Sequence, residues 1–207
     1  SKYNLKTKQF SDFPAISGRQ KILVIGQVEG DASLQYGSPH IKRNLDLLAQ
    51  VRQLWPGAYL VYRPHPDVSA GWRKDSLDLA QAQHYANVIR TEGDITDWLD
   101  WADEVHVMTS LTGFEALLRG KSVVCHGLPF YSGWGLTHDI YAIARTKRPL
   151  RLEELIAGAL ILYPQYRSLL NQRHPQITAV QAIEELVILK NKNKINWLGW
   201  LQPFMKY

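Results

Sequence analysis

The sequence predicts an α/β fold in which a parallel sheet is flanked by helices. Short apolar runs with the composition of buried strands alternate with segments whose apolar residues recur at helical spacing. Polar and glycine-containing stretches follow several of these runs, where connections are expected. With 207 residues, 45% of them hydrophobic, the chain is long enough to bury one core and carry an appendage.

The predicted elements follow one another in a β-α-β-α-β order. Residues 21–27 form the first strand, and residues 38–55 form an amphipathic helix whose apolar face contains Ile41, Leu45, Leu48 and Val51. The other predicted strands are 58–63, 87–90, 103–109 and 121–126, and the other predicted helices are 76–86, 95–102, 112–119, 152–162 and 178–191. Asp94 is the expected N-cap of one helix, and Gly120 closes another. This alternation is typical of a Rossmann-like sheet.

Composition bounds the class and the compartment. We expect a linker or N-terminal segment at 1–20, a Rossmann-like domain at 21–162, and C-terminal helices with an aromatic and basic tail at 163–207. No apolar run reaches the roughly 18 residues of a membrane span, and residues 1–20 lack the apolar core of a signal peptide. The single cysteine, Cys125, excludes an internal disulfide framework, so we expect a cytoplasmic location. The net charge of +5 favours anionic partners without indicating nucleic acid.

Polar side chains gather where four of the predicted strands end, which is the edge where open parallel sheets bind ligands. After the first strand, Glu29 and Asp31 flank Gly30 and offer carboxylates for nucleophilic or base chemistry. Asp31 also suits the cap of a following turn. A glycine-rich dinucleotide fingerprint is absent. After the fifth strand comes the stretch Gly127 to Tyr131, which we include in the predicted binding site.

The second strand ends in Arg63, followed by His65 between two prolines. Proline restricts the backbone on both sides of His65, so the imidazole is held rigidly. A rigid imidazole suits phosphate binding or proton transfer to a leaving group. Arg63 is either a phosphate ligand or a surface charge.

The fourth strand runs into a helix through Thr109, Ser110, Thr112 and Gly113. Hydroxyls and unpaired N–H groups at a helix start cap the helix or hold a phosphate, and both roles are compatible. Glu115 follows Thr112 by three residues, which predicts a capping box; the carboxylate is also suited to a ribose hydroxyl. The sequence therefore predicts a site for the phosphate of a nucleotide-activated sugar.

Four motifs resemble those of capsule-polysaccharide β-Kdo transferases of the KpsC type. They are Gln-Val-Glu-Gly-Asp-Ala-Ser at 27–33, Tyr-Arg-Pro-His-Pro at 62–66, Ser-Leu-Thr-Gly-Phe-Glu-Ala-Leu at 110–117 and Pro-Phe-Tyr-Ser-Gly-Trp-Gly-Leu-Thr at 129–137. The match covers residues 20–140 in order, and the last motif is the most specific.

The resemblance implies a retaining GT-B glycosyltransferase that transfers β-Kdo from CMP-Kdo to a lipid-linked glycan in capsule polysaccharide biosynthesis. It implies that His65, Ser110 and Thr112 hold the CMP phosphate and that Glu115 lies near the ribose. By the same resemblance, the acidic catalytic residue is Asp31, with Glu29 the second candidate. No Asp-x-Asp motif is present, so neither a metal nor another cofactor is expected.

The size of the chain departs from this resemblance. A GT-B enzyme has two Rossmann-like domains with the active site between them, and one set of strands is evident here. We therefore expect the donor-binding C-terminal half of a module, inactive without the missing N-terminal domain. The start at Ser1 also suggests processing or a piece of a longer protein.

Two other functions fit the same motifs. One is another nucleotide-sugar enzyme, either sialyltransferase-like or a GT-B epimerase, which CMP and UDP binding would separate. The other is a non-catalytic module that binds a ligand or a partner protein.

The tail at 190–207 has two interpretations as well. Its lysines and aromatic residues suit the surface of an anionic inner membrane. Packing on the missing domain is favoured, because the apolar stretch is short and Pro203 interrupts a helix.

Overall fold

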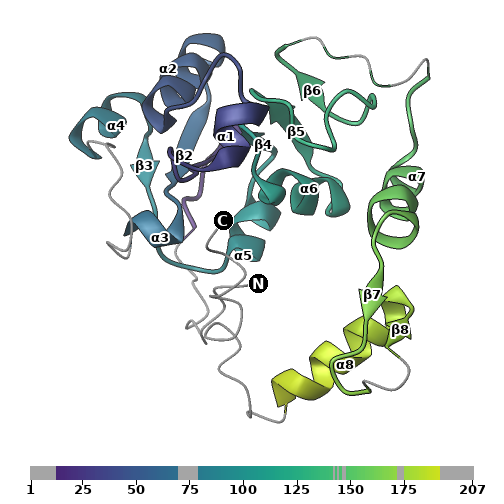
Figure 1. Cartoon of the computed structure of the whole chain (residues 1–207). Coiled ribbons are helices and arrows are strands. Elements are labelled where there is room, and N and C mark those ends of the chain that lie inside the picture. The colour runs from purple at the N-terminus through teal and green to yellow at the C-terminus, as the bar shows by residue number, and fades with distance from the viewer. Residues whose placement is uncertain are drawn as a thin grey trace. The chain divides into compact units, whose positions relative to one another are not determined.

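The computed structural model describes residues 13–69, 79–141, 143, 145, 148–171 and 175–191 (Figure 1). The chain divides into two compact units, Ser1–Leu152 and Glu153–Tyr207. Residues 192–207 of the tail predicted at 190–207 and residues 76–78 of the helix predicted at 76–86 lie outside the described residues.

The first unit is built on a six-stranded sheet in the order β3-β2-β1-β4-β5-β6. All five strand pairings are parallel. The strands are β1 (Lys21–Ile25), β2 (Tyr59–Arg63), β3 (Val88–Ile89), β4 (Glu104–Val107), β5 (Ser122–Cys125) and β6 (His138–Asp139). The predicted Rossmann-like α/β class is therefore confirmed. β6 was not predicted, because two polar residues carry no strand periodicity.

The helices of this unit alternate with the strands along the chain. They are α1 (Ala32–Gly37), α2 (Asn44–Leu54), α3 (Pro66–Ser69), α4 (Leu79–Tyr85), α5 (Ile95–Trp101) and α6 (Leu111–Leu118). The helix predicted to begin at residue 38 begins at Asn44 instead. Ser38 donates its hydroxyl to the carbonyl of Ile41, so a local turn replaces the expected first helical turns. The buried face of α2 contains Leu47 rather than the predicted Leu45.

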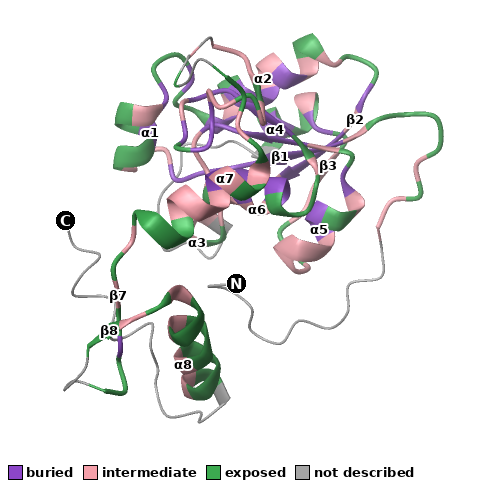
Figure 2. Ribbon diagram, turned by 90° about the vertical axis from the view of Figure 1, so that its right-hand side faces the viewer, coloured by how far each residue is buried: buried purple, intermediate pink, exposed green. Residues whose placement is uncertain are grey.

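Two layers of helices cover the sheet. α1, α2 and α4 pack on one face, where Ile22 and Val24 of β1 meet Leu48 of α2 in one apolar cluster. Residues alternate between the faces of a strand, so Leu23 and Ile25 face the other side, where α5 contacts β1 and α6 contacts β4 and β5. Figure 2 shows that the buried residues concentrate in the strands between these layers.

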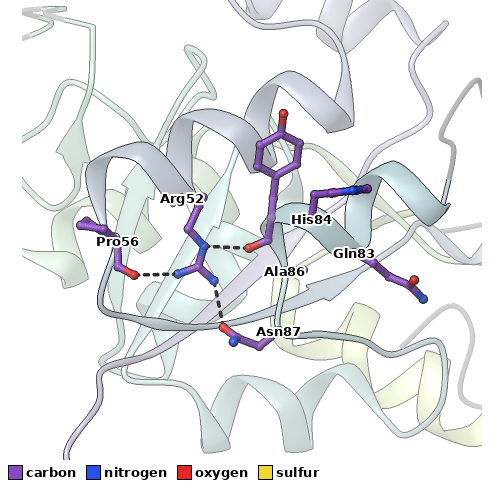
Figure 3. A pocket seen from close by; sticks show the side chains of 7 residues that line it. Arg52, Pro56, Gln83, His84, Ala86 and Asn87 are labelled. Atoms are coloured by element: carbon purple, nitrogen blue, oxygen red, sulfur yellow. Dashed lines mark hydrogen bonds between the residues drawn. The ribbon is translucent and has the colours of Figure 1, made fainter.

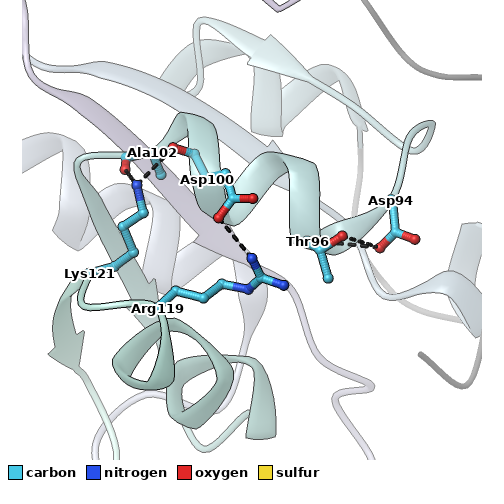
Figure 4. Close-up of polar contacts among 6 residues, drawn as sticks. All are labelled: Asp94, Thr96, Asp100, Ala102, Arg119 and Lys121. Atoms are coloured by element: carbon cyan, nitrogen blue, oxygen red, sulfur yellow. Dashed lines mark hydrogen bonds and ion pairs between the residues drawn. The ribbon is translucent and has the colours of Figure 1, made fainter.

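Both ends of α5 are satisfied by side chains (Figure 4). The carboxylate of Asp94 accepts a hydrogen bond from the N–H of Thr96 at 3.0 Å, which confirms the predicted N-cap. At the other end, Lys121 donates to the carbonyls of Asp100 and Ala102 at 2.7 and 3.0 Å. Because Lys121 directly precedes β5, this contact fixes α5 to the amino-terminal edge of the sheet.

The second unit holds most of α7 (Leu152–Ile156), a π-helical segment η1 (Ala157–Leu162), an antiparallel pair formed by β7 (Tyr166–Arg167) and β8 (Gln176–Ile177), and α8 (Ala179–Asn191). Both predicted helices are present, although the first changes to π-helical geometry halfway. The carboxylate of Glu185 on α8 accepts from the hydroxyl of Ser168 at 2.5 Å and from the N–H of Leu169 at 2.9 Å, which fixes α8 to β7. None of the helices in the described residues combines the length and the apolarity needed to cross a membrane.

Candidate functional site

The carboxyl-terminal edge of the sheet contains a topological switch point. β1 lies between β2 and β4, and the chain leaves β1 and β4 toward helices on opposite faces. Such a point leaves a crevice between the two loops, and ligands of open α/β sheets bind there. Residues 27–31 follow β1 and residues 109–112 follow β4, so two of the predicted stretches border the crevice.

Gln27 links these two loops across the crevice. Its amide oxygen accepts from the N–H of Thr109 at 2.8 Å, and its amide nitrogen donates to the Thr109 hydroxyl at 2.9 Å. In the β1–β4 ladder Ile22 lies opposite Glu104, an offset that places Gln27 opposite Thr109. The Gln27 side chain therefore continues the strand pairing beyond the end of the backbone ladder.

Asn44, the first residue of α2, holds the backbone of Gln27. The Asn44 side chain accepts from the N–H of Gln27 at 2.9 Å and donates to its carbonyl at 2.8 Å. Asn44 is fully buried, and Gln27 is 8% exposed. Buried amide groups are costly without partners, and each of these side chains uses both its oxygen and its nitrogen.

The two candidate carboxylates have different surroundings. Glu29 accepts a hydrogen bond from the N–H of Asn44 at 2.7 Å, which places its negative charge at the start of α2. Asp31 occupies the N-cap position of α1 with extended backbone, but its carboxylate makes no capping hydrogen bond. Glu29 thus has a structural role at the start of α2, and the choice between the two carboxylates as the reactive one stays a prediction.

The start of α6 differs from the prediction. Ser110 is the N-cap, and its hydroxyl oxygen accepts from the N–H of Thr112 at 3.2 Å. The expected capping box between Thr112 and Glu115 is wrong, because the helix begins earlier, at Leu111. In the observed frame the residue three positions after the cap is Gly113, and Glu115 lies half-buried in the second turn.

Tyr131 supports this helix start from the side of β5. Tyr131 is fully buried, and its hydroxyl donates to the carbonyl of Ser110. Burial raises the pKa of Tyr131, so the hydroxyl stays protonated and remains a donor. A Cβ on Gly113 would lie 2.2 Å from the Tyr131 oxygen, so only glycine fits there. Substrate binding by Gly113 and Tyr131 stays a prediction, and both have a packing role.

Gly127 has a similar packing role. A Cβ at this position would lie 2.8 Å from the carbonyl oxygen of Met108 and 3.0 Å from that of Gly37. The next residue, Leu128, donates its N–H to the Gly37 carbonyl at 2.6 Å. The end of α1 is therefore anchored against the loops after β4 and β5. Since α1 has six residues, Asp31 lies roughly 9 Å along the helix from this anchor.

Arg63 ends β2, the other neighbour of β1, and His65 follows two residues later. The N–H of Asp67 donates to Nδ1 of His65 at 3.1 Å, so in the neutral ring the proton is carried by Nε2. Arg63 donates to the carbonyls of Glu92 and Gly93 at 2.6 and 2.5 Å and so fastens the loop before α5. His65 thus has an N–H suited to an anionic oxygen, whereas two nitrogens of Arg63 serve the fold.

Sequence reasoning missed a row of hydrogen-bonded polar side chains that includes two buried histidines. Glu104 lies 2.9 Å from Nε2 of His106, whose Nδ1 lies 3.0 Å from Nε2 of His126; Nδ1 of His126 lies 2.6 Å from the amide oxygen of Gln50. Both histidines are fully buried, and burial lowers the pKa of each, that of His126 to about 3. Alternating Glu-x-His in a predicted strand was the available signal.

Gln27 and Asn44 were also missed as organising residues. Gln27 was part of a motif, but its amide carried no assigned role, because its partner Thr109 is 82 residues away. Asn44 was placed inside a helix rather than at its start. Asn44 lies three residues after Ile41, which is the spacing of the apolar face of the predicted helix, and a polar residue at that position was the signal that a boundary was misplaced.

A pocket of about 460 Å³ lies at the opposite, amino-terminal edge (Figure 3). Its lining includes Arg52, Gln83, His84 and Asn87. Arg52 donates to the carbonyls of Tyr85 and Ala58 at 2.8 and 3.0 Å, and to the side chain of Asn87 at 2.9 Å. These donors are already used within the fold, so the pocket does not compete with the crevice as the chemical site.

Comparison with known proteins identifies a matching family and similar relatives. The family described as "Capsule polysaccharide biosynthesis protein" matches residues 2–173. The capsule polysaccharide modification protein LipA of Neisseria meningitidis serogroup B is 52% identical over 197 residues, covering 95% of this chain and 27% of LipA. This chain therefore spans about a quarter of that relative.

Two solved structures of Thermosulfurimonas dismutans KpsC are similar to the chain. The β-Kdo 2,7 transferase has a TM-score of 0.76 and 48% identity, and the match covers 86% of this chain and 56% of that one. The β-Kdo 2,4 transferase has a TM-score of 0.69 and 33% identity, covering 84% and 54%. The expected resemblance to KpsC-type transferases is confirmed.

The sheet, its switch point and these neighbours define a Rossmann-like domain similar to part of two β-Kdo transferases. More narrowly, the chain belongs to the family of capsule polysaccharide biosynthesis proteins.

Proposed function

We propose that this chain is the donor-binding half of a capsule-polysaccharide β-Kdo transferase and that it binds CMP-Kdo at the crevice between β1 and β4. The observation that carries the proposal is the start of α6 at the switch point. There Ser110 caps the helix with its hydroxyl oxygen, which leaves the hydroxyl proton able to donate to a phosphate. The similarity to two β-Kdo transferases supports the choice of sugar.

The donor phosphate is proposed to bind Ser110, Thr112 and His65. The two hydroxyls and the helix start supply donors, and Nε2–H of His65 supplies another. Because the helix N-terminus carries partial positive charge, an anionic phosphate is favoured there. Glu115, one turn further along α6, is proposed to meet the ribose hydroxyls.

The chemistry proceeds through the Kdo anomeric carbon. The bond from this carbon to the phosphate oxygen breaks, and CMP departs with the electron pair. Asp31 attacks the same carbon to form a covalent adduct, and His65 stabilises the charge on the departing phosphate. The hydroxyl of a glycan acceptor then displaces Asp31 and loses its proton. Two inversions give retention of configuration.

Calorimetry of this chain with CMP, UDP and CMP-Kdo, each with and without a chelator, tests the donor assignment. We expect CMP and CMP-Kdo each to bind with the same affinity with and without the chelator. UDP should bind at least tenfold more weakly than CMP, a difference in binding free energy of about 1.4 kcal/mol. Preference for UDP would instead indicate an epimerase or another nucleotide-sugar enzyme. Absence of binding to all three nucleotides would contradict the proposed function.

A second experiment tests whether this chain is one half of the enzyme. We expect no transfer when the chain is mixed with CMP-Kdo and a Kdo-terminated acceptor, because the acceptor side of the cleft is proposed to lie in another domain. A longer polypeptide with both GT-B domains is the positive control. Product formed by the chain alone would show that the proposed division into halves is wrong.

A further inference from the structure

The turn from Thr109 to Thr112 is held on both sides by buried side chains. Gln27 comes from the loop after β1 and Tyr131 from the loop after β5, and these two strands flank β4 in the sheet. Gln27 forms two hydrogen bonds with Thr109, one through its oxygen and one through its nitrogen. Tyr131 donates to the carbonyl of Ser110. Thr109, just before the helix cap, and Ser110, the cap itself, are therefore each fixed by a loop that follows a different strand.

We propose that Gln27 and Tyr131 are positioning residues for phosphate binding. They hold the Thr109–Thr112 turn so that the Ser110 hydroxyl and the N–H groups at the start of α6 converge on one anion. The inference rests on the proposed function, because it names the residues that shape that phosphate site. Tyr131 thereby changes role, from a predicted substrate ligand to a support behind the turn.

Burial separates this role from direct contact with substrate. Tyr131 is fully buried and Gln27 is 8% exposed, so neither side chain reaches a ligand in the crevice. Gly113 packs against the Tyr131 ring on the inner side of α6, which keeps the ring behind the helix.

Precise placement matters because the ligands of the phosphate are short-range donors. N–H···O hydrogen bonds weaken steeply when they lengthen beyond about 3.2 Å or bend below about 120°. A turn held by a single side chain keeps more conformational freedom than a turn held at two points. Attachment at both Thr109 and Ser110 removes this freedom before the ligand arrives, so binding does not require the turn to be ordered.

The test compares the affinities of this chain for CMP and for cytidine, which lacks the phosphate. The dissociation constant of cytidine divided by that of CMP measures what the phosphate site contributes to affinity. Gln27→Met keeps the length of the side chain without its hydrogen bonds, and Tyr131→Phe removes one oxygen atom. We expect each variant to bind CMP about tenfold more weakly, with cytidine affinity unchanged.

Matched controls carry the same substitutions elsewhere. Gln83→Met alters an exposed glutamine at the amino-terminal pocket, and Tyr163→Phe alters a tyrosine that is 89% exposed in the second unit. Both should keep the wild-type ratio. Thr109→Val and Thr109→Ser form a second pair. Valine lacks the hydroxyl that Gln27 contacts, so Thr109→Val should lower the ratio. Serine keeps the hydroxyl, so Thr109→Ser should keep the wild-type ratio.

The outcomes separate the two levels of the argument. Variants that are folded, with thermal transitions near that of the wild type, and that keep the wild-type ratio would overturn the positioning role alone. An equal loss of affinity for CMP and cytidine would overturn it too, because a general structural defect is not specific to phosphate. A wild-type chain that binds cytidine as tightly as CMP would overturn the phosphate site itself, and the inference with it.

Discussion

The two edges of the sheet use polar side chains in different ways. At the amino-terminal edge, long cationic side chains donate to backbone carbonyls: Arg19 to Gly57 and Ala58, Arg52 to Tyr85 and Ala58, and Lys121 to Asp100 and Ala102. At the carboxyl-terminal edge Arg63 does the same for Glu92 and Gly93, but there neutral and acidic side chains also link one loop to the next. The first arrangement closes the ends of helices and turns. The second holds the loops beside the switch point, where the nucleotide is proposed to bind.

This difference shows why a cavity alone does not locate the site. The pocket of about 460 Å³ lies at the edge where the Arg52 nitrogens donate to groups of the protein itself. The crevice at the other edge is marked by the strand order and by the network from Asn44 through Gln27 to Thr109. Substitutions at the two edges should therefore separate stability from nucleotide chemistry.

The largest expected effect is at Asp31. In an intact enzyme with both domains, Asp31→Asn should lower turnover by on the order of 10³-fold or more, since a carboxamide is a poor nucleophile. CMP affinity should remain near that of the wild type. Initial rates with CMP-Kdo, together with calorimetry, measure the two effects.

Glu29→Gln is the matched control for Asp31→Asn. Its amide still has an oxygen that accepts from the N–H of Asn44, so we expect mainly a loss of the charge interaction at the start of α2, about 0.3–1 kcal/mol of stability. An inactive Glu29→Gln beside an active Asp31→Asn would exchange the roles of the two carboxylates.

The amino-terminal edge should show the opposite pattern. Arg52→Met keeps the aliphatic stem and removes donors to the Tyr85 and Ala58 carbonyls and the Asn87 side chain. We expect the free energy of unfolding to fall by about 2–3 kcal/mol, because the part-buried bonds to the Tyr85 and Ala58 carbonyls lose their charged donor. CMP affinity measured below the thermal transition should not change. Weaker CMP binding by the folded variant would mean that the two edges are not independent.

A histidine at each edge sharpens the comparison. His65→Ala should weaken CMP binding by about 1–3 kcal/mol, the range for a hydrogen bond to a charged group. His84→Ala, at the exposed end of α4 beside the amino-terminal pocket, should leave CMP affinity unchanged. Equal affinities of the wild type and His65→Ala would remove His65 from the phosphate site.

Most of the sheet followed from the sequence because buried parallel strands form continuous apolar runs. β1, β2, β4 and β5 all fall within their predicted ranges. The helix predicted at 38–55 failed at its start, since Ile41 is buried but belongs to a turn before α2. Burial sets the hydrophobic pattern, and the pattern alone does not show where helical backbone begins.

For the candidate site, the sequence predicted which residues lie at strand ends but not which side chains hold the loops in place. His65, Ser110 and Asp31 lie at strand ends, and strand ends can be predicted locally. The role of Gln27 depends on a partner 82 residues away, and that of Tyr131 on one 21 residues away. Such pairings follow from strand order and register, which periodicity does not supply. The capping-box error is of the same kind, because moving the helix start by one residue changed every capping partner.

The smallest expected effect concerns the histidine chain that runs between the two edges. Glu104 begins β4 at the amino-terminal edge, and His126 follows β5 at the other. Burial, reinforced by the nearby His106 and His138, lowers the pKa of His126 to about 3 in the folded protein. In the unfolded chain the pKa returns to about 6.5. Between these values only the unfolded state binds the proton, so the free energy of unfolding falls as pH falls.

From pH 6 to pH 5 we expect His126 to contribute a loss of about 1 kcal/mol, close to the limit of about 1.4 kcal/mol per pH unit for one proton. Burial also lowers the pKa of His106, which adds to the same loss. The pKa of Glu104 is lowered by its hydrogen bond from His106, so its own contribution is lost only below its ordinary value of 4.5. Between pH 6 and pH 5 the change in the free energy of unfolding therefore reports on the histidines.

Urea unfolding at both pH values should show a smaller pH dependence of this free energy in His126→Gln than in the wild type. His84→Gln, which alters an exposed histidine, should keep the pH dependence of the wild type. An identical pH dependence in His126→Gln and the wild type would mean that His126 does not resist protonation, and that the interior between the two edges tolerates a charge.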